Sequence, residues 1–227
     1  MNWMKKVAVA LVCLLPLGLQ AAKVDTLQVK SPSMNKSIEV VVVSPDVAAT
    51  KACPVIYLLH GYGGNACTWV GIKPDLPKIA DEKGIFFVCP DGKNTWYWDS
   101  PLNADVRYET FISDELVKYV DSHYKTVADR KGRAITGLSM GGHGAMWNGL
   151  RHSDVFSAAG STSGGVDIRP FPKNWEMSVQ IGEKAKYPEN WEKYTVINLV
   201  PTLRKDQIAL IFDCGDSDFF LEVNKNY

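Results

Sequence analysis

One serine stands in a sequence context that could make it a nucleophile. Ser139 is the central residue of Gly137-Leu138-Ser139-Met140-Gly141, which fits the pattern G-x-S-x-G. In that pattern the serine occupies a strained turn between a strand and a helix, and flanking glycines leave room for the turn. The residue after the serine points its backbone N–H into the site, so Met140 is predicted to donate to an oxyanion.

The pentapeptide alone is a weak signal, because glycine and serine are common enough to produce chance matches. Its neighbours make it more specific. Ala134 to Thr136 is a short strand-like run, and residues 142–150 have helical composition. A strand, a tight turn and a helix are the context that a nucleophile elbow requires. We therefore predict that Ser139 is a catalytic nucleophile.

A second glycine-rich stretch follows an early apolar strand. Residues 54–59 form that strand, which runs into His60-Gly61-Tyr62-Gly63-Gly64-Asn65. Acyl transfer needs two N–H donors aimed at the developing oxyanion, and one of them often comes from a loop of the type HG-x-G. Gly61 or Tyr62 would supply this donor, and we favour Tyr62. A plain strand-ending turn is the alternative, which Ser139 downstream makes less attractive.

Three adjacent aromatic residues follow the next apolar strand, residues 85–89. Trp96, Tyr97 and Trp98 lie in an otherwise polar loop, where three neighbouring rings are not expected to face a core together. We predict that they line the substrate site, because aromatic rings suit sugar rings and aromatic acyl groups. Packing of the loop against the core is the alternative.

The chain around these motifs alternates between strand and helix patterns. Two β-branched strands, 23–30 and 36–44, are followed by the apolar runs 54–59, 85–89, 134–136, 156–161 and 208–212, with helices at 76–83, 108–123 and 142–150. This alternation predicts an α/β fold with three layers and a mostly parallel sheet. Residues 163–201 break the pattern and are predicted to be an insertion, or lid, over the site.

Composition limits the class of protein. A chain of 227 residues with 46% hydrophobic and 22% charged residues is an ordinary globular chain of one domain. The formal net charge is +0 and no basic run occurs, which argues against a nucleic-acid partner. The cysteines and histidines show no zinc spacing. We expect no metal and no cofactor.

The first 22 residues resemble a signal peptide. Lys5 and Lys6 precede an apolar stretch, residues 7–19, and Ala21-Ala22 offers a cleavage site. This stretch is too short for a stable membrane anchor, although an uncleaved anchor is the alternative. We expect an exported protein, periplasmic or extracellular, with residues 23–227 as the mature domain. Export would permit a disulfide, and Cys53 with Cys67 is the one pair that we consider.

The motifs together resemble the putative-esterase family of α/β-hydrolases. The similarity runs from about Lys36 to the end of the chain and rests on YLLHGYGG, the PDG turn, YETFISDEL, GLSMGGHGA and FDCGDSDFF. The family includes esterase D (S-formylglutathione hydrolase), secreted feruloyl and acetyl xylan esterases and, more distantly, mycolyltransferases. The resemblance implies Ser139 as nucleophile and Asp218 as the acid of a Ser-His-Asp triad. Asp216 is the second choice for the acid, and Asp213 is expected to be structural.

The histidine of that triad should follow the acid. All four histidines, His60, His123, His143 and His152, precede Asp218. We therefore expect that a C-terminal part carrying the histidine is missing and that these 227 residues form an impaired enzyme.

The expected function is that of a secreted serine carboxylester hydrolase. Its expected substrate is a carbohydrate-linked ester of feruloyl or acetyl type, cleaved through an acyl-enzyme. Two alternatives stay open. One is an acyltransferase of the mycolyltransferase type, and the other is a non-catalytic carbohydrate-binding relative, which the absent histidine would favour.

Overall fold

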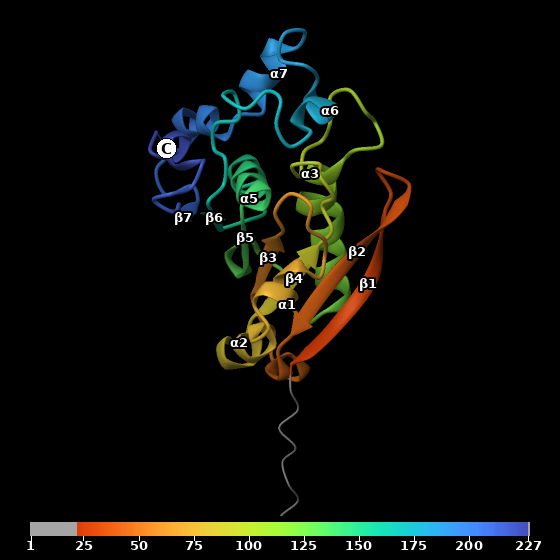
Figure 1. Cartoon of the computed structure of the whole chain (residues 1–227). Coiled ribbons are helices and arrows are strands. Elements are labelled where there is room, and N and C mark those ends of the chain that lie inside the picture. Colours follow the sequence, from red (N-terminus) through yellow and green to blue (C-terminus); the bar gives the residue numbers. More distant parts are fainter. Residues whose placement is uncertain (1–21, 227) are drawn as a thin grey trace, which may run out of the picture.

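The computed structural model of the chain describes residues 22–226 and contains one sheet flanked by helices (Figure 1). Its seven strands follow the order β1-β2-β4-β3-β5-β6-β7. Their bounds are β1 (Lys23–Ser31), β2 (Lys36–Ser44), β3 (Val55–Leu59), β4 (Phe86–Pro90), β5 (Arg133–Gly137), β6 (Ala158–Thr162) and β7 (Ala209–Asp213).

The sheet is parallel except at one edge. β1 pairs antiparallel with β2, and β2 pairs antiparallel with β4. β4, β3, β5, β6 and β7 are parallel to one another. Because parallel strands end at the same edge of a sheet, the loops that leave β3, β4, β5, β6 and β7 all meet there. This edge carries every predicted site residue.

Helices cover both faces of the sheet. They are α1 (Thr68–Ile72), α2 (Leu76–Lys83), α3 (Tyr108–Thr110), the π-helical segment η2 (Phe111–Glu115), α4 (Leu116–His123), α5 (Met140–Arg151), α6 (Met177–Ile181), α7 (Pro188–Lys193) and α8 (Leu221–Asn224). Short 3₁₀ segments are η1 (Asp46–Ala49), η3 (Arg130–Gly132) and η4 (Val196–Thr202).

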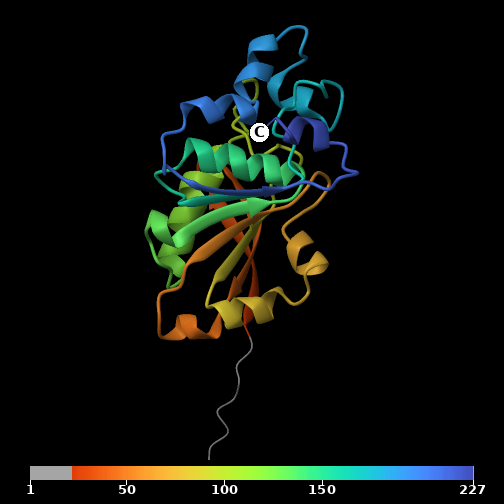
Figure 2. The ribbon, with the colours of Figure 1, turned by 90° about the vertical axis from the view of Figure 1, so that its left-hand side faces the viewer.

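Alternate side chains of the central strands face two separate hydrophobic clusters. Val40 and Val42 join the large cluster that includes α4 and α5, whereas Val41 and Val43 pack with Leu76 and Ala80 of α2. Successive strand residues point to opposite faces, so each buried strand needs apolar side chains throughout. Figure 2 shows α5 and α2 on opposite sides of the sheet. The predicted three-layer α/β fold is confirmed.

Helix α5 is unusually rich in glycine. Four of its twelve residues are Gly141, Gly142, Gly144 and Gly149. A Cβ at any of them would come within 3.0 Å of another element, among them the Leu59 carbonyl and the Tyr97 ring. The helix therefore lies closer to its neighbours than side chains would allow.

The predicted insertion, 163–201, lies beyond the edge where the parallel strands end (top of Figure 1). It consists of α6, α7, η4 and the segments between them. Ser100 donates a hydrogen bond to the Gln180 carbonyl at 2.6 Å, and Tyr194 donates to the Asp99 carbonyl at 2.6 Å. The insertion is thus fixed to the loop that follows β4. Its role as a lid stays a prediction.

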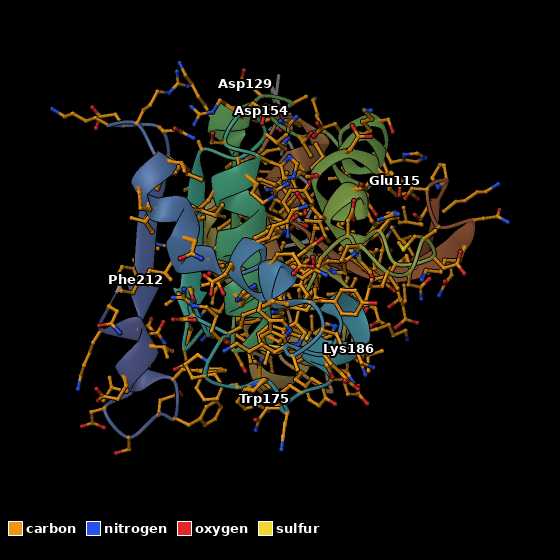
Figure 3. The ribbon with its side chains drawn as sticks, turned by 90° about the horizontal axis from the view of Figure 1, so that it is seen from above. Glu115, Asp129, Asp154, Trp175, Lys186 and Phe212 are labelled. Atoms are coloured by element: carbon orange, nitrogen blue, oxygen red, sulfur yellow. The ribbon has the colours of Figure 1, made fainter. Side chains whose placement is uncertain are left out.

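Strand β7 differs from the other parallel strands, because all five of its residues are exposed. Ile211 is 75% exposed and Leu210 is 37% exposed. Figure 3 shows Phe212 at the periphery of the molecule, seen from above. Exposure on both faces is unusual for a parallel strand, which normally has helices on either side.

Two expectations from the sequence concern the N-terminal residues and the cysteines. The predicted signal peptide lies almost entirely outside the described residues. Cys53, Cys67, Cys89 and Cys214 are all free thiols. The disulfide considered between Cys53 and Cys67 is therefore wrong. Cys53 precedes β3 and Cys67 follows it, and the strand between them is about 16 Å long, more than twice what a disulfide spans.

Between residues 22 and 226 no helix has the length and apolar character needed to cross a membrane.

Candidate active site

Ser139 occupies a strained turn between β5 and α5. Its backbone angles are φ 53° and ψ −119°, and it is the N-cap of α5. A positive φ is costly for a residue with a Cβ and persists only where the surroundings impose it. Here the Ser139 N–H donates to the Thr162 carbonyl of β6 at 2.9 Å, and the His143 N–H donates to the Ser139 carbonyl at 3.0 Å. The serine hydroxyl is left at a half-buried tip.

The glycines on either side of the serine are required by contact. A Cβ on Gly137 would lie 2.4 Å from the Gly141 carbonyl carbon, and a Cβ on Gly141 would lie 2.2 Å from the Leu59 carbonyl oxygen. Real Cβ atoms do not approach other atoms so closely, and backbone cannot move aside as a flexible side chain can. The strand-turn-helix predicted around Ser139 therefore has the geometry of a nucleophile elbow.

The loop after β3 lies directly beside this elbow. A Cβ built on Gly61 would be 3.5 Å from the Ser139 Cβ, so the Gly61–Tyr62 peptide borders the serine. Met140 is the first residue of α5, and a first helical residue has no partner for its N–H within the helix. Within residues 22–226, neither the Tyr62 N–H nor the Met140 N–H has a hydrogen-bond acceptor. Both remain available to an oxyanion.

The loop itself is a tight turn. The Gly64 N–H donates to the Gly61 carbonyl at 3.0 Å, and Gly63, the third residue of the turn, has φ 75°. A positive φ at the third position is what a type II turn needs, and glycine supplies it without strain. Tyr62 is the second residue of the turn, and its side chain is 38% exposed.

His60 holds this turn to the loop after β4. Its ring is 1% exposed, its Nε2 accepts a hydrogen bond from the Gly92 N–H at 2.9 Å, and its Nδ1 lies 2.7 Å from the Gly61 carbonyl. Since Nε2 is an acceptor, Nδ1 must carry the proton and donate to Gly61. Both ring nitrogens are engaged, so His60 is a structural residue here and not a free base.

His143 is buried one turn into α5. Its Nδ1 donates to the Gly165 carbonyl at 2.7 Å, and its Nε2 accepts from the Trp98 indole at 3.0 Å. Burial is the main cause that lowers the pKa of His143 to about 4. A neutral imidazole with both nitrogens bonded joins the elbow helix to two loops and cannot collect the proton of Ser139.

The other two histidines are distant from the elbow or engaged elsewhere. His152 follows the last residue of α5, so roughly 20 Å of helix separates it from Ser139. Its Nε2 lies 2.8 Å from Glu109. His123 ends α4, where it stacks on Tyr119 with ring centroids 4.0 Å apart. No histidine among the described residues is placed to act as the base.

The predicted acid lies in the exposed loop after β7. Asp218 Oδ1 accepts a hydrogen bond from the Phe220 N–H at 2.7 Å, and its other carboxylate oxygen has no partner within the described chain. Among residues 22–226, Asp216 accepts only from its neighbour Ser217, at 3.2 Å. Asp213 is the last residue of β7, and its carbonyl accepts from Ser163. Of the three, Asp218 alone is half-buried, whereas Asp213 and Asp216 are exposed.

The loop of Asp218 is connected to the elbow through packed rings. Phe220 is buried, and a Cβ on Gly165 would lie 2.9 Å from its ring. The Gly165 carbonyl is the acceptor of His143. No contact joins Ser139 and Asp218 directly, and none is needed, because in a triad the histidine lies between the nucleophile and the acid.

The burial of Trp96, Tyr97 and Trp98 contradicts the prediction that they bind substrate. They are 1%, 0% and 0% exposed and belong to the large core cluster. The insertion covers them from one side, since the Trp96 indole donates to the Trp175 carbonyl at 3.1 Å, and α5 lies against Tyr97. Rings so enclosed have no face to offer a ligand. Trp191 of the insertion is also fully buried.

Other aromatic side chains lie at this edge: Tyr62 and Phe219 are exposed, and Trp175 is half-buried. Phe219 is 61% exposed and stacks on Trp175 with ring centroids 5.3 Å apart. Figure 3 shows Trp175 at the margin of the molecule. We call Tyr62, Trp175 and Phe219 the rim aromatics. Sequence reasoning missed Phe219, although its position beside Asp218 could have indicated it.

Sequence reasoning also missed a buried ionic cluster at the far end of α5. Glu109 is 7% exposed and accepts hydrogen bonds from Trp147, Arg151 and His152, each at 2.8 Å. Burial favours its neutral form, yet His152 and Arg151 lower the pKa of Glu109 to about 2. The carboxylate therefore holds the helix in place and has no access to the serine.

A polar cleft borders the other side of the loop after β3. Its volume is about 360 Å³, and its lining is mostly polar: Gln28, Ser37, Ile38, Glu39, Asn65, Asp91 and Lys93. Across residues 22–226 no group of three or more His, Cys, Asp or Glu side chains is arranged to hold a metal ion.

The sequence profile of the family described as "Putative esterase" matches residues 31–226. Over 149 residues the chain is 28% identical to an esterase of Mycobacterium tuberculosis. The alignment covers 63% of this chain but only 32% of that protein. It is 25% identical over 189 residues to an acetyl esterase of Caldicellulosiruptor saccharolyticus, covering 75% of this chain and 68% of that protein. The chain thus spans about a third of the length of the mycobacterial relative.

Solved structures show the same similarity. The structure of a ferulic acid esterase superposes with a TM-score of 0.73 at 30% sequence identity, covering 91% of this chain and 84% of the other. The elbow, the turn after β3 and the loop after β7 all lie within the range that the family profile matches.

Proposed function

Because the chain belongs to the "Putative esterase" family of α/β-hydrolases, we propose that it hydrolyses carboxylic esters with Ser139 as the nucleophile. The observation that carries the proposal is the elbow itself. Ser139 is held at φ 53° beside two N–H groups without acceptors in the described chain. A fold alone does not determine activity. A strained serine beside two backbone N–H groups that lack acceptors is, however, typical of sites for acyl transfer.

The proposed reaction follows from these positions. The Ser139 hydroxyl loses its proton to a histidine and attacks the ester carbonyl, whose oxygen gains negative charge. The N–H groups of Tyr62 and Met140 donate to that oxygen, and the N-terminal end of α5 adds a favourable dipole. Collapse of the intermediate breaks the ester C–O bond, and the histidine gives its proton to the departing alcohol oxygen. Water, deprotonated by the same histidine, then attacks the acyl-enzyme, which releases the acid and restores the Ser139 hydroxyl.

The proposed base lies outside the described residues. A serine hydroxyl is a weak nucleophile and needs a positioned base. His60 and His143 have both ring nitrogens engaged, and His152 is at the far end of α5. We therefore propose that a histidine from another part of the natural protein reaches the space between Ser139 and Asp218. The free oxygen of Asp218 would orient it.

The proposed substrate is an ester of a carbohydrate, with a feruloyl or acetyl group as the acid part. Three observations support this. Two solved or curated relatives are named as a ferulic acid esterase and an acetyl esterase. Of the rim aromatics, Tyr62 and Phe219 offer exposed rings for an aromatic acid, in place of the buried Trp96 and Trp98. The polar cleft beside Asn65 offers carboxylate and amine groups for sugar hydroxyls.

Export of the protein supports a carbohydrate ester and is itself a proposal, resting on the residues 1–22. Cleavage there would leave the α/β domain outside the cytosol. Sequencing the N-terminus of protein recovered from the producing cells tests this, and an intact Met1 on the mature protein would contradict it.

A non-catalytic binding protein is the second candidate function. One observation favours it, namely that no histidine in the described chain can serve Ser139. Such a protein would bind the carbohydrate ester and leave it intact. The acyltransferase alternative has no observation of its own in this structure.

The test of the proposed function is covalent labelling of the full-length natural protein. We expect a fluorophosphonate to label Ser139, identified by mass spectrometry, and Ser139→Ala to lose about four or more orders of magnitude in ester turnover. Methyl ferulate, acetylated xylan and S-formylglutathione are then compared as substrates. Labelling of another serine would overturn the nucleophile, and preference for the thioester would overturn the substrate. Binding without turnover would favour the second candidate.

A further inference from the structure

The oxyanion turn, residues 61–64, is held by the side chain of Asn94 in addition to that of His60. Asn94 Oδ1 accepts a hydrogen bond from the Gly63 N–H at 2.9 Å. Asn94 Nδ2 donates to Glu176 Oε2 at 3.2 Å. Only one orientation of the carboxamide permits both bonds. Rotated by 180°, its NH₂ group would face the Gly63 N–H and its oxygen would face the Glu176 carboxylate.

The Gly63 N–H is a sensitive point of this turn. In a type II turn the central peptide, here between Tyr62 and Gly63, can rotate and convert the turn to type I, which changes the sign of φ at the third residue. The hydrogen bond to Asn94 fixes that peptide. The Tyr62 N–H belongs to the preceding peptide, which shares the Tyr62 Cα with the central peptide. The bond from the Gly63 N–H to Asn94 restrains the position of that Cα, and with it the peptide that carries the Tyr62 N–H.

Asn94 itself stands on a rigid support. The Lys93 N–H donates to Asp91 at 2.9 Å, and Thr95 Oγ1 donates to the Gly92 carbonyl at 2.6 Å. A Cβ on Gly92 would lie 2.1 Å from the Tyr97 ring, so the loop is pressed against the core. The backbone that carries the half-buried Asn94 side chain is therefore held in place.

The partner on the insertion is equally constrained. Four of the nine non-glycine residues with positive φ in the described chain are Trp96, Tyr97, Trp175 and Glu176, with φ between 47° and 60°. Bulky residues rarely adopt this conformation. The two strained pairs are joined by the hydrogen bond from the Trp96 indole to the Trp175 carbonyl. This strain places Glu176 within reach of Asn94.

Glu176 also lies beside the phenol of Tyr62. Desolvation and a hydrogen bond with the Glu176 carboxylate raise the pKa of Tyr62. Glu176 of the insertion thus reaches the turn in two ways. It contacts the Tyr62 side chain directly, and it binds Asn94, which in turn accepts from the Gly63 N–H.

We propose that Asn94 is a positioning residue for the oxyanion hole and that Glu176 of the insertion fixes Asn94 in the required orientation. The insertion then contributes to catalysis as well as covering the core, because Glu176, acting through Asn94, keeps the Tyr62 N–H pointed towards the oxyanion. This inference rests on the proposed function, since it assigns the same turn to the oxyanion.

The test measures kcat and KM of the full-length natural protein on p-nitrophenyl acetate. Loss of one oxyanion donor costs about 10²–10³ in kcat, so a donor that is loosened should cost less, about ten- to a hundredfold, in Asn94→Ala. KM should stay within about threefold, because the donor acts on the transition state. Asn174→Ala is the matched control, since the Asn174 carboxamide is exposed and has no hydrogen bond within residues 22–226.

A pair of isosteric variants separates positioning from a general loss of structure. Asn94→Asp keeps the acceptor for Gly63 but sets a carboxylate against Glu176, so kcat should fall. Glu176→Gln alone should change kcat by less than about threefold, because an amide oxygen still accepts from Asn94. When both changes are combined, the amide introduced at position 176 can donate to the carboxylate introduced at position 94. The kcat of this double variant should recover to within about threefold of Glu176→Gln.

Two results would overturn the inference: an Asn94→Ala kcat equal to that of Asn174→Ala, or a double variant no faster than Asn94→Asp alone. Thermal unfolding of each variant shows whether the fold is kept, and the double variant keeps the comparison valid if Asn94→Ala does not fold. Failure of the proposed function is a separate outcome. In that case the unaltered protein would neither hydrolyse the ester nor be labelled at Ser139.

Discussion

The two halves of the candidate site differ in how firmly the chain holds them. The nucleophile half, consisting of the elbow and the oxyanion turn, is fixed by the buried rings of His60 and His143 and by backbone contacts too close for a Cβ. The acid half, β7 and the loop 214–220, is exposed over most of its length. The described residues therefore hold firmly the N–H groups that we propose as oxyanion donors, but none of their histidines is placed to accept the proton of Ser139.

The largest expected effect, a loss of kcat, comes from a substitution in the acid half. In the active full-length protein, Asp218→Asn should lower kcat by about 10⁴, because an amide no longer holds a histidine in the correct tautomer. Asp216→Asn is the control, and its kcat should stay within about threefold of the unaltered protein. Steady-state kinetics on p-nitrophenyl acetate measures both. The reverse ranking would move the acid to Asp216.

The next largest effect, a loss of stability, comes from a substitution that disturbs the packing of the nucleophile half. Gly141→Ala should reduce the free energy of unfolding by about 3 kcal/mol or more, because the new Cβ meets the Leu59 carbonyl at 2.2 Å. Gly71→Ala is the matched change, since a Cβ there meets nothing within 4 Å. A helical alanine at position 71 should be neutral or stabilising by up to about 1 kcal/mol. Urea unfolding of the two variants checks this, and equal stabilities would contradict the close contact at Gly141.

Much of the nucleophile half could be predicted from the sequence, because its determinants are local. Gly137, Ser139 and Gly141 lie within five residues, and the strand and helix around them have clear patterns. The position of Trp96 and Trp98 could not be predicted in this way. Their burial depends on residues of the insertion some eighty positions later, such as Trp175, which no local pattern relates to them.

Glu109 shows the same limit. In the sequence it lies at the start of an amphipathic helix and looks like a solvated charge. Its three partners come from the far end of α5, about forty residues on, and only the folded chain brings them together.

A smaller effect tests how deeply the nucleophile half is buried, through its dependence on pH. Folding lowers the pKa of His143 from 6.5 to about 4. The unfolded chain therefore binds the proton first as the pH falls. The stabilisation from the neutral ring is fully present above pH 6.5 and is lost between pH 6.5 and pH 4, about 3 kcal/mol in all.

The measurement is urea unfolding at several pH values, with His143→Gln as the variant that cannot titrate. Its stability should vary less over that window. Glu109 contributes in a different window, since its stabilisation is present above pH 4.5 and is lost as the pH falls towards 2. An unchanged slope between pH 6.5 and pH 4 in His143→Gln would contradict the burial of this ring.

The smallest effect sharpens the contrast between the two halves directly. Ile135 of β5 is 0% exposed and Ile211 of β7 is 75% exposed. Removing one methyl group by Ile135→Val should cost about 1 kcal/mol, whereas Ile211→Val should change stability by only a few tenths of a kcal/mol. Thermal and urea unfolding give both values. An equal cost would mean that β7 is covered in the natural protein by something outside residues 22–226.

The glycines of α5 have a consequence for the order in which the molecule folds. Relative to alanine, four glycines weaken the intrinsic helix by about 4 kcal/mol, so α5 is not expected to form by itself in the unfolded chain. We expect it to become helical only once β3, β6 and the loop at Tyr97 pack around it, because its glycines lie against these elements in the native state. The strained conformation of Ser139 would then exist only in the finished native state. Titration with a fluorophosphonate would count folded molecules, and its time course during refolding would report the last step of assembly.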